Sequence, residues 1–364
     1  MIETFYARTP YEWSQKEKEK MLTKELLALT EYHMEHCREY QSILNALSFD
    51  VNNVSDYLDI PFLPVRLFKE QDLLSVPREA VFKTMTSSGT TGQQVSKIYL
   101  DRNTAMMQQK VMVKILSDYL GKKRLPMLII DTPSVIKDRS LFTARGAAIL
   151  GLQVMAKKMT FVLNEDMSLN FCKLEQFLAE HKGEKFLIFG FTFLVWQHFY
   201  EELRQKEKNR TELAEAMSKA WLMTGGGWKK LQSLHISNEA FKQQIQEVCG
   251  IHHFLDHYGM VEQTGCIYAE CEYGHLHASI YSDVIPRRYE DFSPCHVGET
   301  GILQVVSVLP HSYPGHSLLT EDEGVVLGVD DCPCGRKGKY IKILGRLKQA
   351  ELRGCSDTYA EKFS

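Results

Sequence analysis

The amino-acid sequence predicts an α/β protein, in which a mixed, largely parallel sheet is followed by a β-rich subdomain. Short apolar runs typical of buried strands, such as residues 186–189, alternate with helical patterns between residues 100 and 250. Strand patterns then dominate residues 251–345. Clusters of glycine follow predicted strands, at the edge where open α/β sheets bind their ligands.

The first hundred residues contain helices and then a strand-loop-strand segment. Leucines at helical spacing between residues 10 and 50 predict amphipathic helices, so the N-terminal part to about residue 60 is expected to be helical. Three prolines, Pro61, Pro64 and Pro77, break the following chain into turns. Residues 80–83 and 95–100 have extended patterns on either side of a loop.

Downstream, helices and strands are expected to alternate. Strands are predicted at residues 125–131, 186–189 and 221–224. Helices are predicted at residues 104–119, 144–150, 200–219 and 238–248.

Composition excludes several classes of protein. The 364 residues carry 43 Lys and Arg against 46 Asp and Glu, so there is no basic surplus typical of nucleic-acid binding. No apolar run is long enough for a membrane span, and the first residues do not resemble a signal peptide. Nine scattered cysteines do not suggest a disulfide framework. A cytoplasmic protein with reduced thiols is therefore expected.

The loop at residues 86–93 holds five hydroxyl side chains and two glycines in eight residues. Such a loop between two strands can direct several N–H and O–H donors at one phosphate chain. A flexible surface loop is the simpler interpretation of this composition, and the rest of the chain argues against it. The residues expected to bind phosphate are Ser87, Ser88, Gly89, Thr90, Thr91 and Gly92.

Four motifs in order resemble those of the adenylate-forming superfamily, which includes acyl-CoA ligases and luciferases. The hydroxyl-rich loop resembles its phosphate loop, and residues 258–262 resemble its Tyr-Gly-x-Thr-Glu motif. Residues 320–322 resemble the motif that holds ribose, and residues 345–348 resemble the Gly-Arg hinge. This chain has Val261 and Glu321 where the superfamily has threonine and glycine.

Finer strings at residues 226–230, 258–265 and 352–356 resemble the acyl-protein synthetase of the bacterial luminescence fatty-acid reductase complex. That resemblance implies an adenylation domain at residues 1–345, with its β-rich subdomain at about 251–345. Residues 346–364 are expected to be a hinge and a cysteine-bearing tail, in place of the longer C-terminal domain of acyl-CoA ligases.

The resemblance implies a site for ATP and Mg²⁺. Glu262 is the expected Mg²⁺ ligand, since this cation prefers oxygen donors. Asp322 is expected to accept hydrogen bonds from ribose, and Arg346 to reach ribose or phosphate. The adenine is expected near Tyr258, Gly259, Gly226 and Gly227. A surface carboxylate for Glu262 and a structural salt bridge for Arg346 are the alternatives.

Cys355 is expected to be catalytic, because a thiolate can take an acyl group from an acyl adenylate as a thioester. It follows a glycine near the end of the chain, and Glu262 and Lys348 are the other expected catalytic residues. The family carries its acyl group on a cysteine at this place. An incidental surface cysteine is the alternative.

Four other residues supply three thiols and one imidazole, a set that suits structural zinc. They are Cys271, His277, Cys332 and Cys334, with Cys266, His275 and Cys295 as alternates. Unpaired structural thiols are an equally weighted interpretation.

The expected function is ATP-dependent activation of a long-chain fatty acid, and its transfer to Cys355. The resemblance implies delivery to an acyl-CoA-type reductase subunit that makes fatty aldehyde, with an acyltransferase as a further partner. A homo-oligomer is left open. The alternatives are an acyl- or aryl-CoA ligase, an acyl transferase to another carrier, and a catalytically inactive scaffold.

Overall fold

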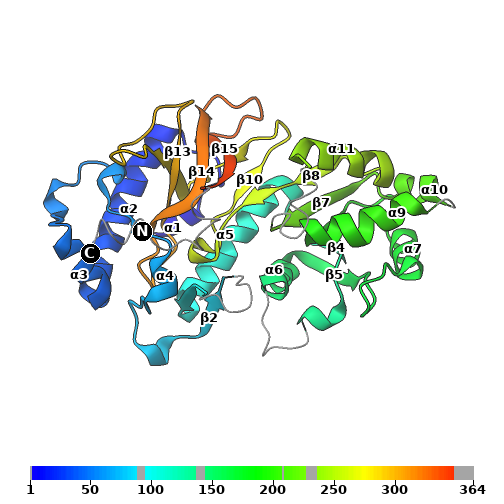
Figure 1. Cartoon of the computed structure of the whole chain (residues 1–364), viewed down its shortest axis with the longest axis horizontal. Coiled ribbons are helices and arrows are strands. Elements are labelled where there is room, and N and C mark those ends of the chain that lie inside the picture. Colours follow the sequence, from blue (N-terminus) through cyan, green and yellow to red (C-terminus); the bar gives the residue numbers. More distant parts are fainter. Residues whose placement is uncertain (1, 88–94, 137–143, 207–208, 227–235, 348–364) are drawn as a thin grey trace. The chain divides into compact units, whose positions relative to one another are not determined.

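The computed structural model describes residues 2–87, 95–136, 144–206, 209–226 and 236–347 (Figure 1). The chain divides into two compact units. The first unit comprises residues 1–121 and 258–364, and the second comprises residues 122–257. Among the described residues, no helix combines the length and apolarity needed to cross a membrane.

The second unit is built on a five-stranded parallel sheet with strand order β5-β4-β6-β7-β8. The strands are β4 (Leu125–Ile129), β5 (Ala156–Phe161), β6 (Phe186–Phe191), β7 (Ala220–Gly225) and β8 (His253–Leu255). Its helices include α6 (Ala144–Leu152), α7 (Phe171–Glu180), α8 (Thr192–Leu194), a π-helix (Val195–Tyr200), α9 (Glu201–Gln205), α10 (Arg210–Ala216) and α11 (Asn238–Cys249). All six residues of β6 are buried, as expected for a central parallel strand covered on both faces.

One glycine of β6 is required by packing. A Cβ atom at Gly190 would lie 2.8 Å from both Ile130 Cβ and Val195 Cγ2. The chain turns into α8 and the π-helix directly after this strand, so the absent side chain allows the helical segment to lie close to β4.

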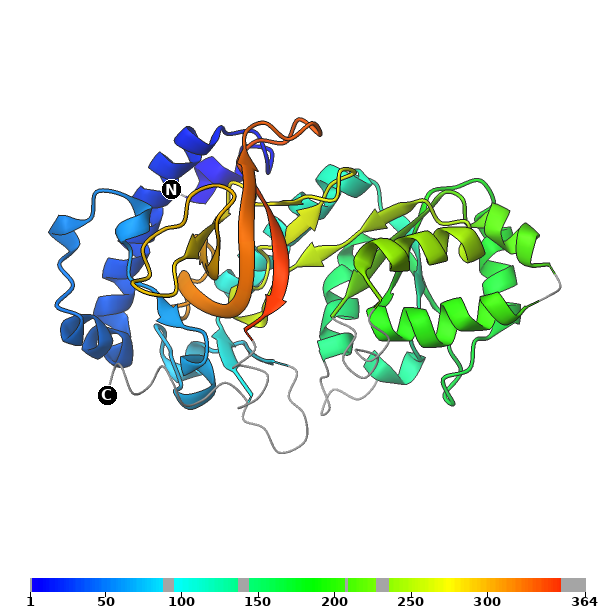
Figure 2. The same cartoon turned by 45° about the horizontal axis from the view of Figure 1, so that its top comes forward.

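The first unit contains a largely antiparallel sheet with strand order β12-β13-β14-β15-β11-β10-β9, and the short β1 pairs in parallel with β14. The strands are β1 (Leu63–Pro64), β9 (His257–Tyr258), β10 (Tyr268–Glu270), β11 (Leu276–His277), β12 (Ser282–Arg287), β13 (Thr300–Ser307), β14 (Ser317–Val329) and β15 (Lys339–Arg346). Figure 2 shows the strong curvature of the long strand β14. A separate ladder joins β2 (Lys83–Thr86) to β3 (Lys97–Leu100).

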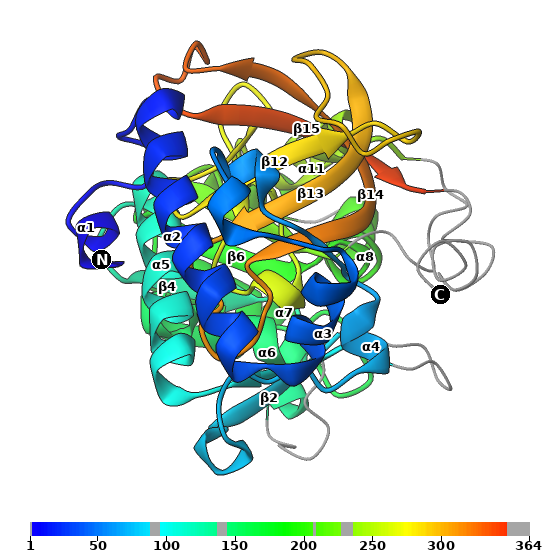
Figure 3. The same ribbon diagram turned by 90° about the vertical axis from the view of Figure 1, so that its left-hand side faces the viewer.

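The α-helices of the first unit, among its described residues, are α1 (Ile2–Tyr6), α2 (Gln15–His36), α3 (Arg38–Ala46), α4 (Leu67–Glu70) and α5 (Arg102–Leu120). Ser14 and Glu17 form a capping box that starts α2. Asp101 caps α5 by accepting a 2.8 Å hydrogen bond from the Thr104 amide. Figure 3 shows α2 passing over the strands β12 to β14.

A buried ionic network fastens α2 to that sheet. The Asp283 carboxylate on β12 accepts hydrogen bonds from Gln15 Nε2 at 2.7 Å and Tyr57 Oη at 2.8 Å. The ammonium groups of Lys18 and Lys339 each lie 3.1 Å from it. Lys18 and Asp283 are almost completely buried, and the carboxylate is compensated by charged and neutral donors together.

The α/β class and the β-rich region after residue 251 are confirmed. The helix predicted over residues 200–219 is wrong as a single element, because α9 ends at Gln205 and Asn209 has φ of +60°. A residue in the left-handed region cannot continue a right-handed helix. The sequence analysis also missed β5 and α7.

Candidate functional site

The base of the hydroxyl-rich loop is fixed by two reciprocal hydrogen bonds. The Ser87 amide donates to the Ser96 carbonyl at 3.2 Å, and the Ser96 amide donates to Ser87 Oγ at 2.9 Å. These bonds continue the β2–β3 ladder beyond its last pair, Thr86 and Lys97. The predicted phosphate-binding residues Ser88, Gly89, Thr90, Thr91 and Gly92 lie outside the described residues.

Glu262 lies in a short 3-10 helix (Val261–Gln263) and is 6% exposed. Burial raises the pKa of its carboxyl group, while the neighbouring Ser96 hydroxyl and the charge of Lys69 oppose that rise. The predicted cation ligand is a desolvated carboxyl group. Its turn lies next to the strand that leads into the hydroxyl-rich loop, because Thr264 Oγ1 lies 3.9 Å from Met85 Sδ on β2. The sequence analysis missed Ser96. The one feature that could have pointed to it is its position, since it is a serine in the strand pattern that directly follows the hydroxyl-rich loop.

Tyr258, Asp322 and Arg346 come together on the sheet of the first unit. The β14–β15 register places Asp322 opposite Arg346, whose Nε lies 3.8 Å from Asp322 Oδ1. Tyr258 Oη donates a 2.7 Å hydrogen bond to Asp322 Oδ2. Burial raises the pKa of the Asp322 carboxyl group, while that hydrogen bond and the Arg346 charge oppose the rise. Gly259 directly follows Tyr258, and a Cβ atom there would lie 3.3 Å from Ile267 Cγ2.

Gly226 belongs to the second unit and directly follows β7. Its φ is +67°, and a Cβ atom would lie 3.0 Å from the Phe191 ring. Thr192 Oγ1 donates a 2.8 Å hydrogen bond to the Gly226 carbonyl. Gly227, Lys348 and Cys355 lie outside the described residues.

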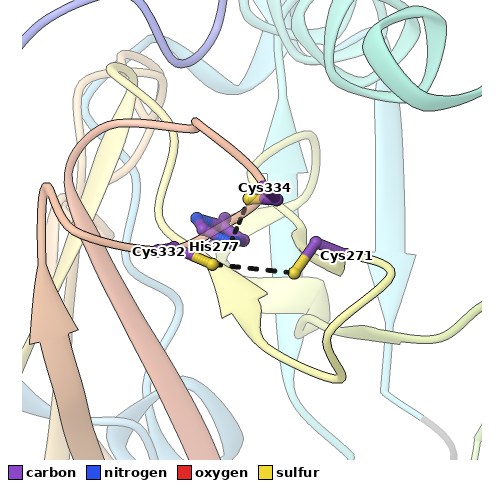
Figure 4. A group of neighbouring side chains, drawn as sticks. All are labelled: Cys271, His277, Cys332 and Cys334. Carbon is purple, nitrogen blue, oxygen red and sulfur yellow. Dashed lines mark hydrogen bonds between the residues drawn. The ribbon is translucent and has the colours of Figure 1, made fainter.

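The four predicted zinc ligands form one cluster in the first unit (Figure 4). The ligand atoms of Cys271, His277, Cys332 and Cys334 all lie within 4.8 Å of one another. Cys271 Sγ lies 3.9 Å from Cys332 Sγ, and His277 Nε2 lies 3.3 Å from Cys334 Sγ. Three segments meet here, because Cys271 follows β10, His277 lies on β11, and the other two cysteines lie in the β14–β15 connection.

Tight turns present the three thiols. The Gly274 amide donates to the Cys271 carbonyl at 2.9 Å, and the Gly335 amide donates to the Cys332 carbonyl at 3.0 Å. Both glycines have positive φ, which most other residues adopt at a cost. Each turn folds back immediately after its cysteine.

Of the three alternates, one lies at the cluster. His275 Nδ1 is 3.2 Å from Cys332 Sγ, and its ring stacks on Tyr340. Cys266 Sγ lies instead beside Ser307 Oγ at 3.2 Å, and Cys295 Sγ lies 3.7 Å from the Thr300 carbonyl. The residues that come together are therefore the four predicted ligands, and His275 lies next to them.

Comparisons with known proteins match nearly the whole chain. The family model described as acyl-protein synthetase, LuxE, matches residues 2–364. A long-chain-fatty-acid–luciferin-component ligase of Vibrio harveyi is 22% identical over 373 residues, covering 98% of this chain and 92% of that protein. The Aliivibrio fischeri protein of the same name is 23% identical, with coverage of 95% and 90%.

Among solved structures, a 2-hydroxyisobutyryl-CoA ligase in its postadenylation state is similar with a TM-score of 0.71. The identity is 15%, and the match covers 93% of this chain and 69% of that chain. This likeness confirms the predicted fold of the adenylate-forming large domain.

Proposed function

This chain belongs to the acyl-protein synthetase family LuxE and is an ATP-dependent ligase, and we propose that it converts a long-chain fatty acid into an acyl adenylate. The observation that carries the proposal is that the turn of Glu262 packs against β2, the strand that leads into the hydroxyl-rich loop, through the contact of Thr264 with Met85. The Tyr258–Asp322–Arg346 group on the same unit supplies the second half of a nucleotide site.

The chemical problem is that a carboxylate oxygen is a poor leaving group. In the proposed reaction a carboxylate oxygen of the fatty acid attacks the α-phosphorus of ATP. The bond from that phosphorus to its bridging oxygen breaks, and pyrophosphate leaves. The enzyme has to align the two reactants and offset the charge on the transferring phosphoryl group.

The residues of the first unit suit these tasks. Ser87 and the rest of the hydroxyl-rich loop would hold the phosphates, and Glu262 would hold Mg²⁺, which supplies positive charge next to them. The Asp322 carboxylate would accept hydrogen bonds from the ribose hydroxyls. Its hydrogen bond from Tyr258 uses only one of the acceptor sites on the two oxygens. Arg346 would lie beside that carboxylate.

The second proposed step moves the acyl group onto the protein. The Cys355 thiolate would attack the acyl carbonyl carbon, form a thioester, and release AMP. Residues 346–364 would act as hinge and tail, and Lys348 would be a further catalytic residue. This step rests on the family resemblance. The acyl group would then pass to an acyl-CoA-type reductase subunit that makes fatty aldehyde, in a complex that includes an acyltransferase.

The adenylation step can be tested alone by ATP–pyrophosphate exchange. We expect exchange that requires both Mg²⁺ and a long-chain fatty acid, and that falls at least tenfold in Glu262→Gln and Asp322→Asn. Glu79→Gln, a change at an exposed carboxylate, is the matched control and should exchange normally. Absence of fatty-acid-dependent exchange in the unaltered protein would overturn the proposal.

We also propose that the Cys271–His277–Cys332–Cys334 cluster holds a structural zinc ion. Bonds of about 2.3 Å to sulfur and about 2.05 Å to nitrogen give a tetrahedron with S–S edges of about 3.8 Å and N–S edges of about 3.6 Å. The observed separations of 3.9 Å and 3.3 Å are close to these edges. A disulfide would need sulfur atoms about 2.05 Å apart.

The proposed zinc would connect the β14–β15 connection to β10 and β11. Elemental analysis of protein purified without chelators should find one zinc per chain. Cys332→Ser and Cys334→Ser should lose the metal, while Cys295→Ser, at a thiol outside the cluster, should keep it. Folded protein that lacks zinc after growth with zinc present would overturn this assignment.

A further inference from the structure

A chain of buried hydrogen bonds leads from α5 to the backbone of Glu262. Gln108 Nε2 donates to Tyr313 Oη at 3.2 Å, and Tyr313 Oη donates to the Glu262 carbonyl at 2.8 Å. Tyr313 is fully buried, and Gln108 is 2% exposed. The tyrosine lies in the connection between β13 and β14, so neither partner is close to Glu262 in the sequence.

The same helix touches the other end of the Glu262 turn. Gly265 has φ of +94°, and a Cβ atom there would lie 2.5 Å from the Gln108 carbonyl oxygen. A side chain at this position would therefore push the turn away from α5. The bare glycine lets the helix backbone at Gln108 and the turn come into direct contact.

The connection that carries Tyr313 is itself fixed to the turn. Gln263 Nε2 donates to the Gly315 carbonyl at 2.9 Å and to the Val305 carbonyl at 3.1 Å. A Cβ atom at Gly315 would lie 3.0 Å from the Glu262 carbonyl oxygen. Glu262 is thus enclosed by contacts on its backbone, and its carboxyl group is left free of these hydrogen bonds.

Helix α5 begins close to the hydroxyl-rich loop in the sequence. The helix starts at Arg102, directly after β3 and the Asp101 cap, and β3 is the strand that leaves the hydroxyl-rich loop. Strand β3 and the start of α5 therefore connect the base of the loop to Gln108, and two hydrogen bonds continue from Gln108 to Tyr313 and from Tyr313 to Glu262. A loop and a carboxylate that act on the same phosphate chain need such a common frame.

We propose that Tyr313 and Gln108 are positioning residues, which set the Glu262 carboxylate at a fixed place relative to Ser87 and Ser96 at the base of the hydroxyl-rich loop. This inference rests on the proposed role of Glu262 in holding Mg²⁺ with ATP. Neither residue touches the reactants. Their effect passes through the backbone of Glu262, so it appears as weaker Mg²⁺-dependent binding of ATP.

The test measures the Mg²⁺ concentration that gives half-maximal ATP binding, by calorimetry on the whole chain without fatty acid. Tyr313→Phe keeps the ring and removes the hydrogen bond to Glu262. We expect the half-maximal concentration to rise about fivefold, which corresponds to about 1 kcal/mol, the size of one such bond. Tyr281→Phe is the matched control, because it removes a buried 3.1 Å bond to the Phe5 carbonyl, and it should leave ATP binding unchanged.

A double-mutant cycle separates positioning from general destabilisation. In a Glu262→Gln background, Tyr313→Phe should add no further weakening, because the carboxylate that it positions is gone. Gln108→Met provides a second variant if Tyr313→Phe does not fold. Gln108→Met removes the donor to Tyr313. It breaks no second hydrogen bond of this side chain, because Gln108 Oε1 has no hydrogen-bond partner among the described residues.

Each outcome identifies what has failed. Unaltered protein that binds ATP with Mg²⁺, together with a Tyr313→Phe variant of equal affinity, overturns the positioning inference and leaves the proposed function standing. Additive effects in the Glu262→Gln background overturn it as well. Unaltered protein that binds no ATP overturns both.

Discussion

Tyr258 Oη donates a 2.7 Å hydrogen bond to Oδ2 of Asp322, across 64 residues of sequence. The sequence analysis expects Tyr258 to lie near adenine, and that role stays a prediction. Its hydroxyl group also bonds the carboxylate that is proposed to hold ribose. Arg346 Nε lies 3.8 Å from the other oxygen, so each oxygen of the Asp322 carboxylate has a partner within the first unit.

This relationship predicts the effect of Tyr258→Phe. The change keeps the ring and leaves the half-buried Asp322 carboxylate with one partner fewer, at a cost of about 1.5–3 kcal/mol for a hydrogen bond to a charged group. We expect the KM for ATP in pyrophosphate exchange to rise about 10- to 100-fold. Tyr273→Phe, at an exposed tyrosine, is the control. An unchanged KM in Tyr258→Phe would contradict an orienting role.

Two glycines with similar backbone angles separate conformational strain from close packing. Gly265 and Gly298 have φ of +94° and +86°, but a Cβ atom at Gly298 would meet nothing within 4 Å. Gly298→Ala should cost about 1 kcal/mol for the left-handed conformation. Gly265→Ala should cost about 2–4 kcal/mol, since overlap with Gln108 is added. Urea unfolding measures both, and equal costs would show that α5 does not constrain the turn.

The buried network around Asp283 predicts an asymmetry between its members. Asp283→Asn leaves two ammonium groups without a carboxylate and should cost about 3–5 kcal/mol in unfolding free energy. Lys18→Met should cost about 2 kcal/mol, because Asp283 keeps Lys339, Gln15 and Tyr57 as partners. Urea titration at neutral pH checks the order. A larger loss in Lys18→Met would contradict this account of the network.

A stacked pair of buried histidines predicts acid sensitivity. His33 lies between Ser75 Oγ and the Pro310 carbonyl, and His316 Nε2 lies 2.9 Å from Thr30 Oγ1 and 3.4 Å from Tyr40 Oη. Burial lowers the pKa of His316 to about 3 and holds that of His33 well below 6.5, and His311 adds repulsion to both rings.

Since the unfolded chain takes up these protons first, near pH 6.5, the stability contribution is complete above pH 6.5 and is lost as pH falls toward the folded values. Each histidine should remove about 1.4 kcal/mol per pH unit well below pH 6.5. Urea unfolding at pH 7, 6 and 5 measures that slope. His316→Gln should reduce the slope by the contribution of one proton, about 1.4 kcal/mol per pH unit. An equal slope in the variant would contradict the role of His316 in acid sensitivity.

The residues that sequence reasoning located have signals in the adjacent sequence. Tyr258, Glu262 and Asp322 each lie in a short motif, and the cysteine pair Cys332 and Cys334 is separated by a single proline. The meeting of Cys271 with Cys332, 61 residues away, could be expected because metal sites gather such sets. Their roles toward ATP and zinc stay predictions.

The residues that sequence reasoning missed act through tertiary contacts. Gln108 and Tyr313 are 205 residues apart, and no local pattern distinguishes this glutamine on α5 or this tyrosine in its loop from other core residues. Strand β5 was missed because two exposed lysines, Lys157 and Lys158, interrupt its apolar pattern. The break at Asn209 depends on one backbone angle that composition does not reveal.

We propose above that the chain uses ATP to load a fatty acid onto its own Cys355. The most direct measurement incubates the protein with ATP, Mg²⁺ and labelled tetradecanoate and then follows label on the chain. We expect the unaltered protein to carry label that hydroxylamine removes. The Cys355→Ser variant should carry no such label, although it should still form acyl-AMP. Label that persists in Cys355→Ser, or that appears only on added CoA, would contradict the claim.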